Sequence, residues 1–183
     1  MKNVMLSFLI LMAAGTLTGQ KYFTKTGSIS FFSDTPMEKI EAQTKSASCV
    51  LDAASGKIEF AALIKSFQFE KALMQEHFNE NYMESSKFPK STFKGQIDNI
   101  TDVDFSKNQK YKVKVSGQLT IHGVTKDIKT DATITTNNGK AECNTSFDVA
   151  VADYGITIPS VVKDNIAKNV NITVSATLEP LKQ

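Results

Sequence analysis

Apolar and polar residues alternate along most of the chain, and the alternation keeps its phase through short turns. The stretch "GQLTIHGVTKDIKTDATI", residues 117–134, shows this around His122-Gly123, where glycine tolerates the positive φ of a two-residue hairpin turn. With the turn placed there, one face is mainly apolar, with Ile121 opposite Val124 and Tyr111 opposite Ile134. The other face carries Thr, Gln, Lys and Asp. A slip of one residue would exchange the two faces, so the pattern predicts a well-defined register.

Two further predicted turns also place the apolar residues on one face of the hairpin that each turn forms. Around Asn138-Gly139, a strong hairpin signal, the pattern predicts the pairs Ile134–Cys143, Ala132–Thr145, Thr130–Phe147 and Ile128–Val149. Around Ser55-Gly56 it predicts the pairs Leu51–Phe60, Cys49–Ala62 and Ala47–Ile64. Three independent turns therefore place the apolar residues on one face of an antiparallel sheet.

The other alternating segments complete a set of eight predicted strands, at residues 22–34, 42–54, 57–69, 91–104, 110–121, 124–136, 140–152 and 168–179. Long antiparallel strands with one apolar face close readily into a barrel, because closure removes the unpaired edges. The sequence therefore predicts an all-β fold: an eight-stranded antiparallel up-and-down barrel, lipocalin-like, with one or two short helices. A sandwich of two packed sheets is the alternative that the same pattern leaves open.

Two stretches interrupt the strands. In "FEKALMQEHFNENYMES", residues 69–85, apolar side chains recur at helical spacing, which predicts an amphipathic helix against one end of the sheet. In "YGITIPSVVKDNIAKN", residues 154–169, apolar residues surround Pro159, which predicts a loop with a short helix before the last strand.

The first residues differ from the rest of the chain. Residues 1–19 resemble a secretory signal peptide, with Lys2 near the start and a short apolar run at residues 4–14. A run this short favours a cleaved signal over the alternative of a permanent anchor. We therefore expect a signal peptide at 1–19 and one domain at 20–183, located in the periplasm or secreted. That compartment permits a disulfide between Cys49 and Cys143, and the sequence leaves their pairing open. We expect both cysteines to be core residues and not nucleophiles.

Charge and candidate chemistry narrow the function classes. The formal net charge of 183 residues is only +2, which argues against the basic surface that nucleic-acid binding uses. The chain has two histidines, His77 and His122, and they lie in different predicted elements. The sequence has neither a Gly-x-Ser-x-Gly motif nor metal-ligand spacing of His and Cys. We therefore expect no metal, no cofactor and no enzymatic activity.

Three segments together resemble the YceI-like family. They are "SFQFEKALMQEHFNENYMESSKFPKSTFKGQI" at 66–97, "GQLTIHGVTKDI" at 117–128 and "DYGITIPSVVKDNI" at 153–166. The resemblance spans almost all of the predicted domain, in the expected order. It implies an exported barrel similar to lipocalins, with a long apolar lumen that binds a polyisoprenoid or related amphiphilic chain. The ligand carries over as a class only.

Under this resemblance the apolar face lines a ligand tunnel. The expected lumen residues are Ile29, Phe31, Phe60, Ala62, Ile64, Phe93, Ile97, Val113, Val115, Leu119, Phe147, Val149, Ile172 and Val174. The 69–85 helix is the expected lid or mouth, with Phe69, Leu73, Met74, His77, Phe78 and Tyr82. Small inward residues indicate room for an elongated chain, namely Gly95, Gly117, Ala47, Ala62, Ala132, Ala141 and Ala176.

Three other interpretations stay open. An outer-membrane barrel would turn the apolar face to lipid, although the chain has no Trp and places Lys126 on that face. A barrel with a filled core would act as a structural or stress-related protein. An enzyme would turn over an amphiphilic substrate. The expected partner is an isoprenoid or other lipid, without nucleic acid and without stable membrane insertion, and a homodimer is left open.

Overall fold

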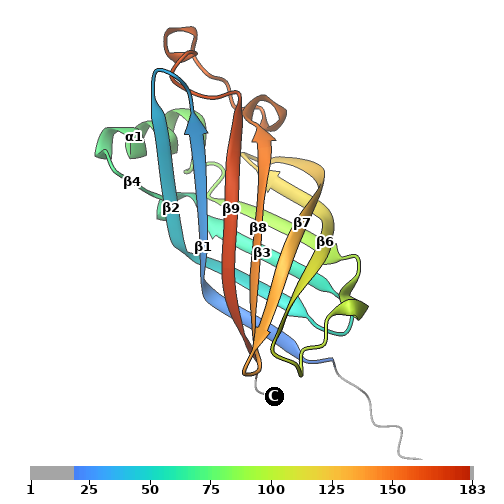
Figure 1. Cartoon of the computed structure of the whole chain (residues 1–183). Helices are drawn as coiled ribbons and strands as arrows, with labels where there is room; N and C mark the ends of the chain where they lie inside the picture. The colour runs from blue at the N-terminus through green and yellow to red at the C-terminus, as the bar shows by residue number, and fades with distance from the viewer. Residues whose placement is uncertain (1–18, 182–183) are drawn as a thin grey trace, which may run out of the picture.

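The computed structural model describes residues 19–181, so the predicted signal peptide lies outside the described residues except for Gly19. Within them, eight long strands form a closed antiparallel barrel in the ring order β1-β9-β8-β7-β6-β5-β3-β2, and β1 pairs with β2 to close it (Figure 1). The strands are β1 (Lys21–Asp34), β2 (Lys39–Asp52), β3 (Lys57–Leu63), β5 (Lys90–Ile97), β6 (Gln109–Ile121), β7 (Val124–Asn137), β8 (Lys140–Ala150) and β9 (Asn169–Pro180). The predicted fold class is confirmed.

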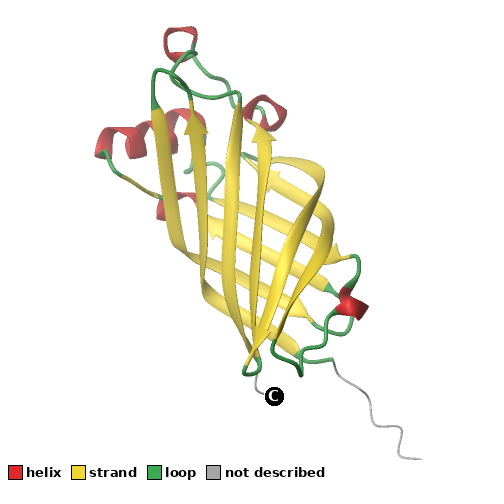
Figure 2. Ribbon diagram, in the orientation of Figure 1, coloured by secondary structure: helices red, strands yellow, loops and turns green. Residues whose placement is uncertain are grey.

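Short elements gather at the two ends of the barrel (Figure 2). They are η1 (Ile64–Ser66), β4 (Gln68–Phe69), α1 (Ala72–His77), the π-helix η2 (Phe78–Tyr82), η3 (Ile100–Asp102), η4 (Val151–Tyr154) and η5 (Ser160–Val162). Among residues 19–181, none of the helices has the length and apolar character needed to cross a bilayer.

Two of the three predicted hairpins have the predicted turn. His122 and Gly123 have φ values of 50° and 75°, and Asn138 and Gly139 have 48° and 76°. These left-handed pairs match the twist of the flanking strands. The β6–β7 register is confirmed along its whole length, from Ile121–Val124 outward to Tyr111–Ile134.

The predicted pairing around Ser55-Gly56 is wrong by two residues. Leu51 pairs with Ile58, and Cys49 pairs with Phe60. The Asp52 carboxylate accepts hydrogen bonds from the backbone N–H groups of Ala54 and Ser55, at 3.0 Å each, so the turn is longer than two residues. A shift of two keeps every side chain on its predicted face, so the inward residues are unchanged.

The predicted β7–β8 pairing is correct only over its lower part. The pairs Ile134–Cys143 and Ala132–Thr145 form, and the ladder ends at the second pair. The predicted pairs Thr130–Phe147 and Ile128–Val149 are therefore wrong. Instead, the Thr145 hydroxyl donates to the Asp131 carbonyl at 2.8 Å, and the strands diverge toward the upper end of the barrel in Figure 1.

Two predicted strands and the predicted helix are too long. The strand predicted at 57–69 ends at Leu63, where the Ile64 N–H turns to donate to the Pro89 carbonyl at 3.0 Å. The strand predicted at 91–104 ends at Ile97, and residues 98–108 fold across the lower end. The helix predicted at 69–85 is divided among β4, α1 and η2.

The lower half of the barrel has a filled core. Phe105, from the segment that crosses the lower end, stacks on Tyr22 with ring centroids 5.0 Å apart. Above them lies one cluster of buried side chains, which includes Cys49, Leu51, Ile58, Ile97, Val113, Ile134, Ala141, Cys143, Ala176 and Leu178. These residues come from seven strands of the ring, so the cluster ties the sheet together at this end.

Candidate functional site

Above this cluster the barrel encloses a cavity of about 550 Å³, and Ile58, Ile97, Val113, Ile134 and Cys143 of the cluster form part of its wall. Its wall is mainly apolar, as the alternation in the strands requires, because every second residue points inward. All the predicted lumen and mouth residues line it except Ile64. Ile64 is buried outside the wall, beside Met83 and Leu119, because the chain leaves the strand geometry at η1. A pocket of this size lies in the range of small-molecule sites.

Phe93 lines the cavity and corrects one expectation. Gly95 and Gly117 were expected to leave room for a ligand, but the Phe93 ring lies directly over both. A Cβ on Gly117 would lie 2.8 Å from the ring and would overlap the Gly95 Cα. These glycines therefore make space for an aromatic side chain of the protein itself. Of the small residues, Ala62 and Ala132 line the cavity, whereas Ala47, Ala141 and Ala176 are packed.

The prediction missed a group of wall residues on β7 and in the segment between β8 and β9. They include Ile128, Thr130, Ile134, Ile156, Ile158, Val162 and Ile166. The residues on β7 could have been predicted, because the predicted β6–β7 register places them on the inward face. Those between β8 and β9 have no regular period, so the sequence carried no signal for their direction.

The segment 68–83, which we call the lid after its predicted role, lines one side of the cavity, and aromatic rings hold it there. Phe78 of η2 lies 5.3 Å from Phe31, 5.9 Å from Phe67 and 5.0 Å from Phe69, measured between ring centroids. The π-helical turn is closed by a 2.9 Å hydrogen bond from the Met83 N–H to the Phe78 carbonyl. Because α1 has only six residues and no side-chain N-cap, tertiary contacts supply most of its stability.

Polar groups gather at the mouth. The Glu38 carboxylate accepts a 3.1 Å hydrogen bond from the Asn165 amide and lies 3.8 Å from the Lys71 ammonium. The buried Ser33 hydroxyl accepts a 2.8 Å hydrogen bond from the Ala167 N–H. These bonds hold the β8–β9 segment and the lid beside the β1–β2 turn. His77, predicted at the mouth, lies there with an exposed side chain.

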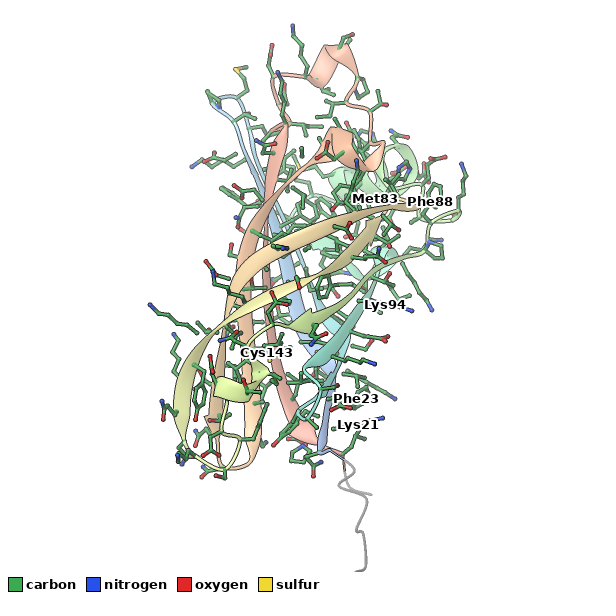
Figure 3. All side chains as sticks on the ribbon, turned by 90° about the vertical axis from the view of Figure 1, so that its right-hand side faces the viewer. Lys21, Phe23, Met83, Phe88, Lys94 and Cys143 are labelled. Atoms are coloured by element: carbon green, nitrogen blue, oxygen red, sulfur yellow. The ribbon has the colours of Figure 1, made fainter. Side chains whose placement is uncertain are left out.

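His122 joins three segments near the mouth. Its Nε2 lies 2.8 Å from a Glu84 carboxylate oxygen, and its Nδ1 lies 3.2 Å from the Tyr154 carbonyl. The ring also packs edge-on against Phe88 at 4.6 Å between centroids. Phe88 and Met83 lie together at this end in Figure 3. Both ring nitrogens therefore have structural partners, which explains why a turn residue is a histidine here.

The two cysteines are free thiols inside the barrel. The disulfide that the compartment would permit is therefore not formed in this structure. Burial raises the pKa of the Cys143 thiol to about 12. Burial, and then the charge of the Cys143 thiol, raise the pKa of Cys49 as well. Thiols of this kind are poor nucleophiles and act as packing residues.

Comparison with known proteins supports the fold. A family model described as a YceI-like domain matches residues 12–178. A search of curated proteins found no match.

Several solved structures share the fold. A polyisoprenoid binding domain from Saccharophagus degradans, implicated in plant cell wall breakdown, has a TM-score of 0.76 at 14% identity, covering 88% of this chain and 98% of that one. BcnA of Burkholderia cenocepacia has a TM-score of 0.68 at 18% identity, covering 83% and 95%. The YCEI protein of Campylobacter jejuni has a TM-score of 0.54 at 19% identity, covering both chains fully.

Proposed function

Since the chain belongs to the YceI-like family and its barrel encloses an apolar cavity, we propose that it is an exported lipid-binding protein. It holds an elongated apolar or amphiphilic lipid, of the polyisoprenoid or quinone type, for transport, storage or scavenging. The cavity is the single observation that carries this proposal. The polyisoprenoid binding domain from Saccharophagus degradans, which shares the fold, supports the choice of ligand class.

The dimensions of the wall suit a chain-like ligand. Along β6 the cavity is lined from Val113 to Ile121, a distance of about 26 Å at roughly 3.3 Å per residue. With strands tilted by about 40°, this corresponds to a depth of about 20 Å. Because the floor is closed by the filled lower half, a longer ligand bends or leaves its polar end at the mouth.

The same arrangement favours binding over catalysis. His122 is held on both sides by Glu84 and the Tyr154 carbonyl, so neither nitrogen faces a ligand. Cys49 and Cys143 are buried thiols with raised pKa values. An enzyme on an amphiphilic substrate is therefore the weaker candidate, and a barrel filled throughout does not account for the cavity. Export, a periplasmic or secreted location and a homodimer remain predictions for fractionation and sedimentation.

Native mass spectrometry of the purified protein, followed by organic extraction, tests the proposal. We expect a discrete mass increment that the solvent removes and that is identified as a lipid. Replacing Ala132 by Phe fills the cavity wall and is expected to abolish the increment. Lys129→Phe, on the exposed outer face of the same strand, is the matched control. A protein that is empty and also rejects added polyprenyl and fatty-chain probes would disprove the proposal.

A further inference from the structure

Three apolar side chains are unusually exposed, and all three surround the cavity mouth. Among residues 19–181, the most exposed large hydrophobic side chains are Val161 at 87%, Met37 at 71% and Leu73 at 61%. They lie on the β8–β9 segment, the β1–β2 turn and α1, three segments that meet at the upper end of the barrel in Figure 1. A single exposed apolar residue needs no explanation, but three at the mouth of an apolar cavity do.

The local structure fixes each of these positions. The β1–β2 turn is closed by a 3.0 Å hydrogen bond from the Glu38 N–H to the Thr35 hydroxyl, with Met37 inside the turn. Val161 lies in η5, where the Val162 N–H bonds to the Pro159 carbonyl at 3.0 Å. The next residues in the chain, Glu38 and Val162, line the cavity, and Leu73 lines it directly. The exposed side chains are therefore continuous with the cavity wall.

We propose that Met37, Leu73 and Val161 dock the mouth of the barrel on the surface of a lipid bilayer. This inference rests on the proposed function, because a lipid of the proposed class resides in membranes. With the three side chains in the interfacial region, the mouth faces the bilayer and the ligand's chain passes into the cavity without crossing water. The contact is peripheral and leaves the barrel outside the membrane.

Charge and area favour this partner over others. At the mouth, Lys39 lies 3.9 Å from Asp34, Lys71 lies 3.8 Å from Glu38, and the exposed Lys163 is followed directly by the exposed Asp164. These lysines are matched by acids, so attraction to anionic head groups is not the driving force. Three separate side chains also expose far less area than the roughly 800 Å² per partner of a stable dimer. Shallow insertion into an uncharged bilayer surface fits both observations.

Vesicle flotation tests the docking surface. The sample is a chain beginning at Gln20, which contains every strand of the closed barrel, mixed with phosphatidylcholine vesicles. We expect it to float with the vesicles at low and at high salt concentration. The triple variant Met37→Ser, Leu73→Ser, Val161→Ser is expected to bind at least about tenfold more weakly, because three apolar side chains no longer insert. Leu181→Ser, at the opposite end, is the matched control and is expected to bind normally.

A fluorescent label gives a second readout. Because Cys49 and Cys143 are buried, a cysteine introduced as Met37→Cys is the site that reacts with an environment-sensitive dye. We expect its emission to shift to shorter wavelength on vesicle addition, and the dye on Leu181→Cys to remain unchanged.

Several results would overturn the inference. They are equal flotation of the parent chain and the triple variant, binding that requires anionic lipid and disappears in salt, or a dimer that the triple substitution dissociates. A parent chain that binds a soluble apolar probe but never floats would remove the docking surface and leave the proposed function intact. Flotation of a parent chain that binds no apolar probe would support the docking surface and contradict the proposed function.

Discussion

Phe78 is the residue on which the lid over the cavity depends most. Its ring contacts three other phenylalanine rings, Phe31, Phe67 and Phe69, with centroids 5.0–5.9 Å apart. Each such pair stabilises a protein by about 0.5–1.5 kcal/mol beyond burial, and replacing a fully buried Phe by Ala costs about 3–5 kcal/mol. Because Phe78 is half-buried, we expect Phe78→Ala to lower the free energy of unfolding by about 2–4 kcal/mol.

The loss is expected to begin in the lid, because α1 has few stabilising contacts of its own. Urea unfolding measures the global effect, and amide hydrogen exchange of residues 72–83 measures the local one. A bound apolar probe is expected to dissociate faster from the variant. Leu73→Ala, on the adjacent helix α1 but mostly exposed, is the control and is expected to change stability by less than about 0.5 kcal/mol. If the two variants unfold at the same urea concentration, the aromatic contacts do not hold the lid.

Three further predictions concern the rest of the barrel. His122→Ala removes the hydrogen bonds to Glu84 and to the Tyr154 carbonyl, and urea unfolding is expected to show a loss of about 1–3 kcal/mol; a loss below that of Glu84→Ala would argue against the role of His122. Gly117→Ala is expected to cost about 1–3 kcal/mol, because its Cβ overlaps Gly95 and displaces the Phe93 ring, and a melting temperature equal to that of the parent protein would contradict this. The buried Cys143 thiol, with its pKa raised from about 9 to about 12, stabilises the fold fully below pH 9 and loses that contribution as the pH rises toward 12. Above pH 9, the free energy of unfolding is therefore expected to fall less steeply with rising pH for Cys143→Ala than for the parent protein. An equal pH dependence of the two proteins would refute the stabilising role of the neutral Cys143 thiol.

The sequence predicted the faces of the strands better than their pairs. At His122-Gly123 the turn needs two residues in left-handed geometry, so the position of the glycine sets the register. At Ser55-Gly56 the glycine has the same conformation, but the Asp52 side chain bonds to the next backbone N–H groups and lengthens the turn. A period of two cannot distinguish registers that differ by two residues. The inward residues were therefore correct although their partners were wrong.

The parts that the sequence did not predict depend on contacts between distant segments. Ile64 looked like one more inward strand residue, and only the Pro89 carbonyl on the neighbouring segment turns the chain there. Gly95 and Gly117 looked like empty space, and only the folded barrel brings the Phe93 ring over them. The π-helical turn of the lid has no signal of its own in the residues 78–82. By contrast, Ile128 and Ile134 could have been added to the wall from the predicted β6–β7 register alone.

Because one end of the barrel is filled and the other is hollow, different residues determine the stability of the fold and the shape of the cavity. Residues such as Cys49, Leu51 and Leu178 are fully enclosed in the lower cluster and carry much of the stability. The side chains around the cavity have open space on one side, so substitutions there disturb less packing. The hollow end can therefore change its ligand over evolutionary time, or in the hands of a protein engineer, while the other end keeps the chain above its stability threshold. This suits the barrel as a scaffold for new small-molecule carriers.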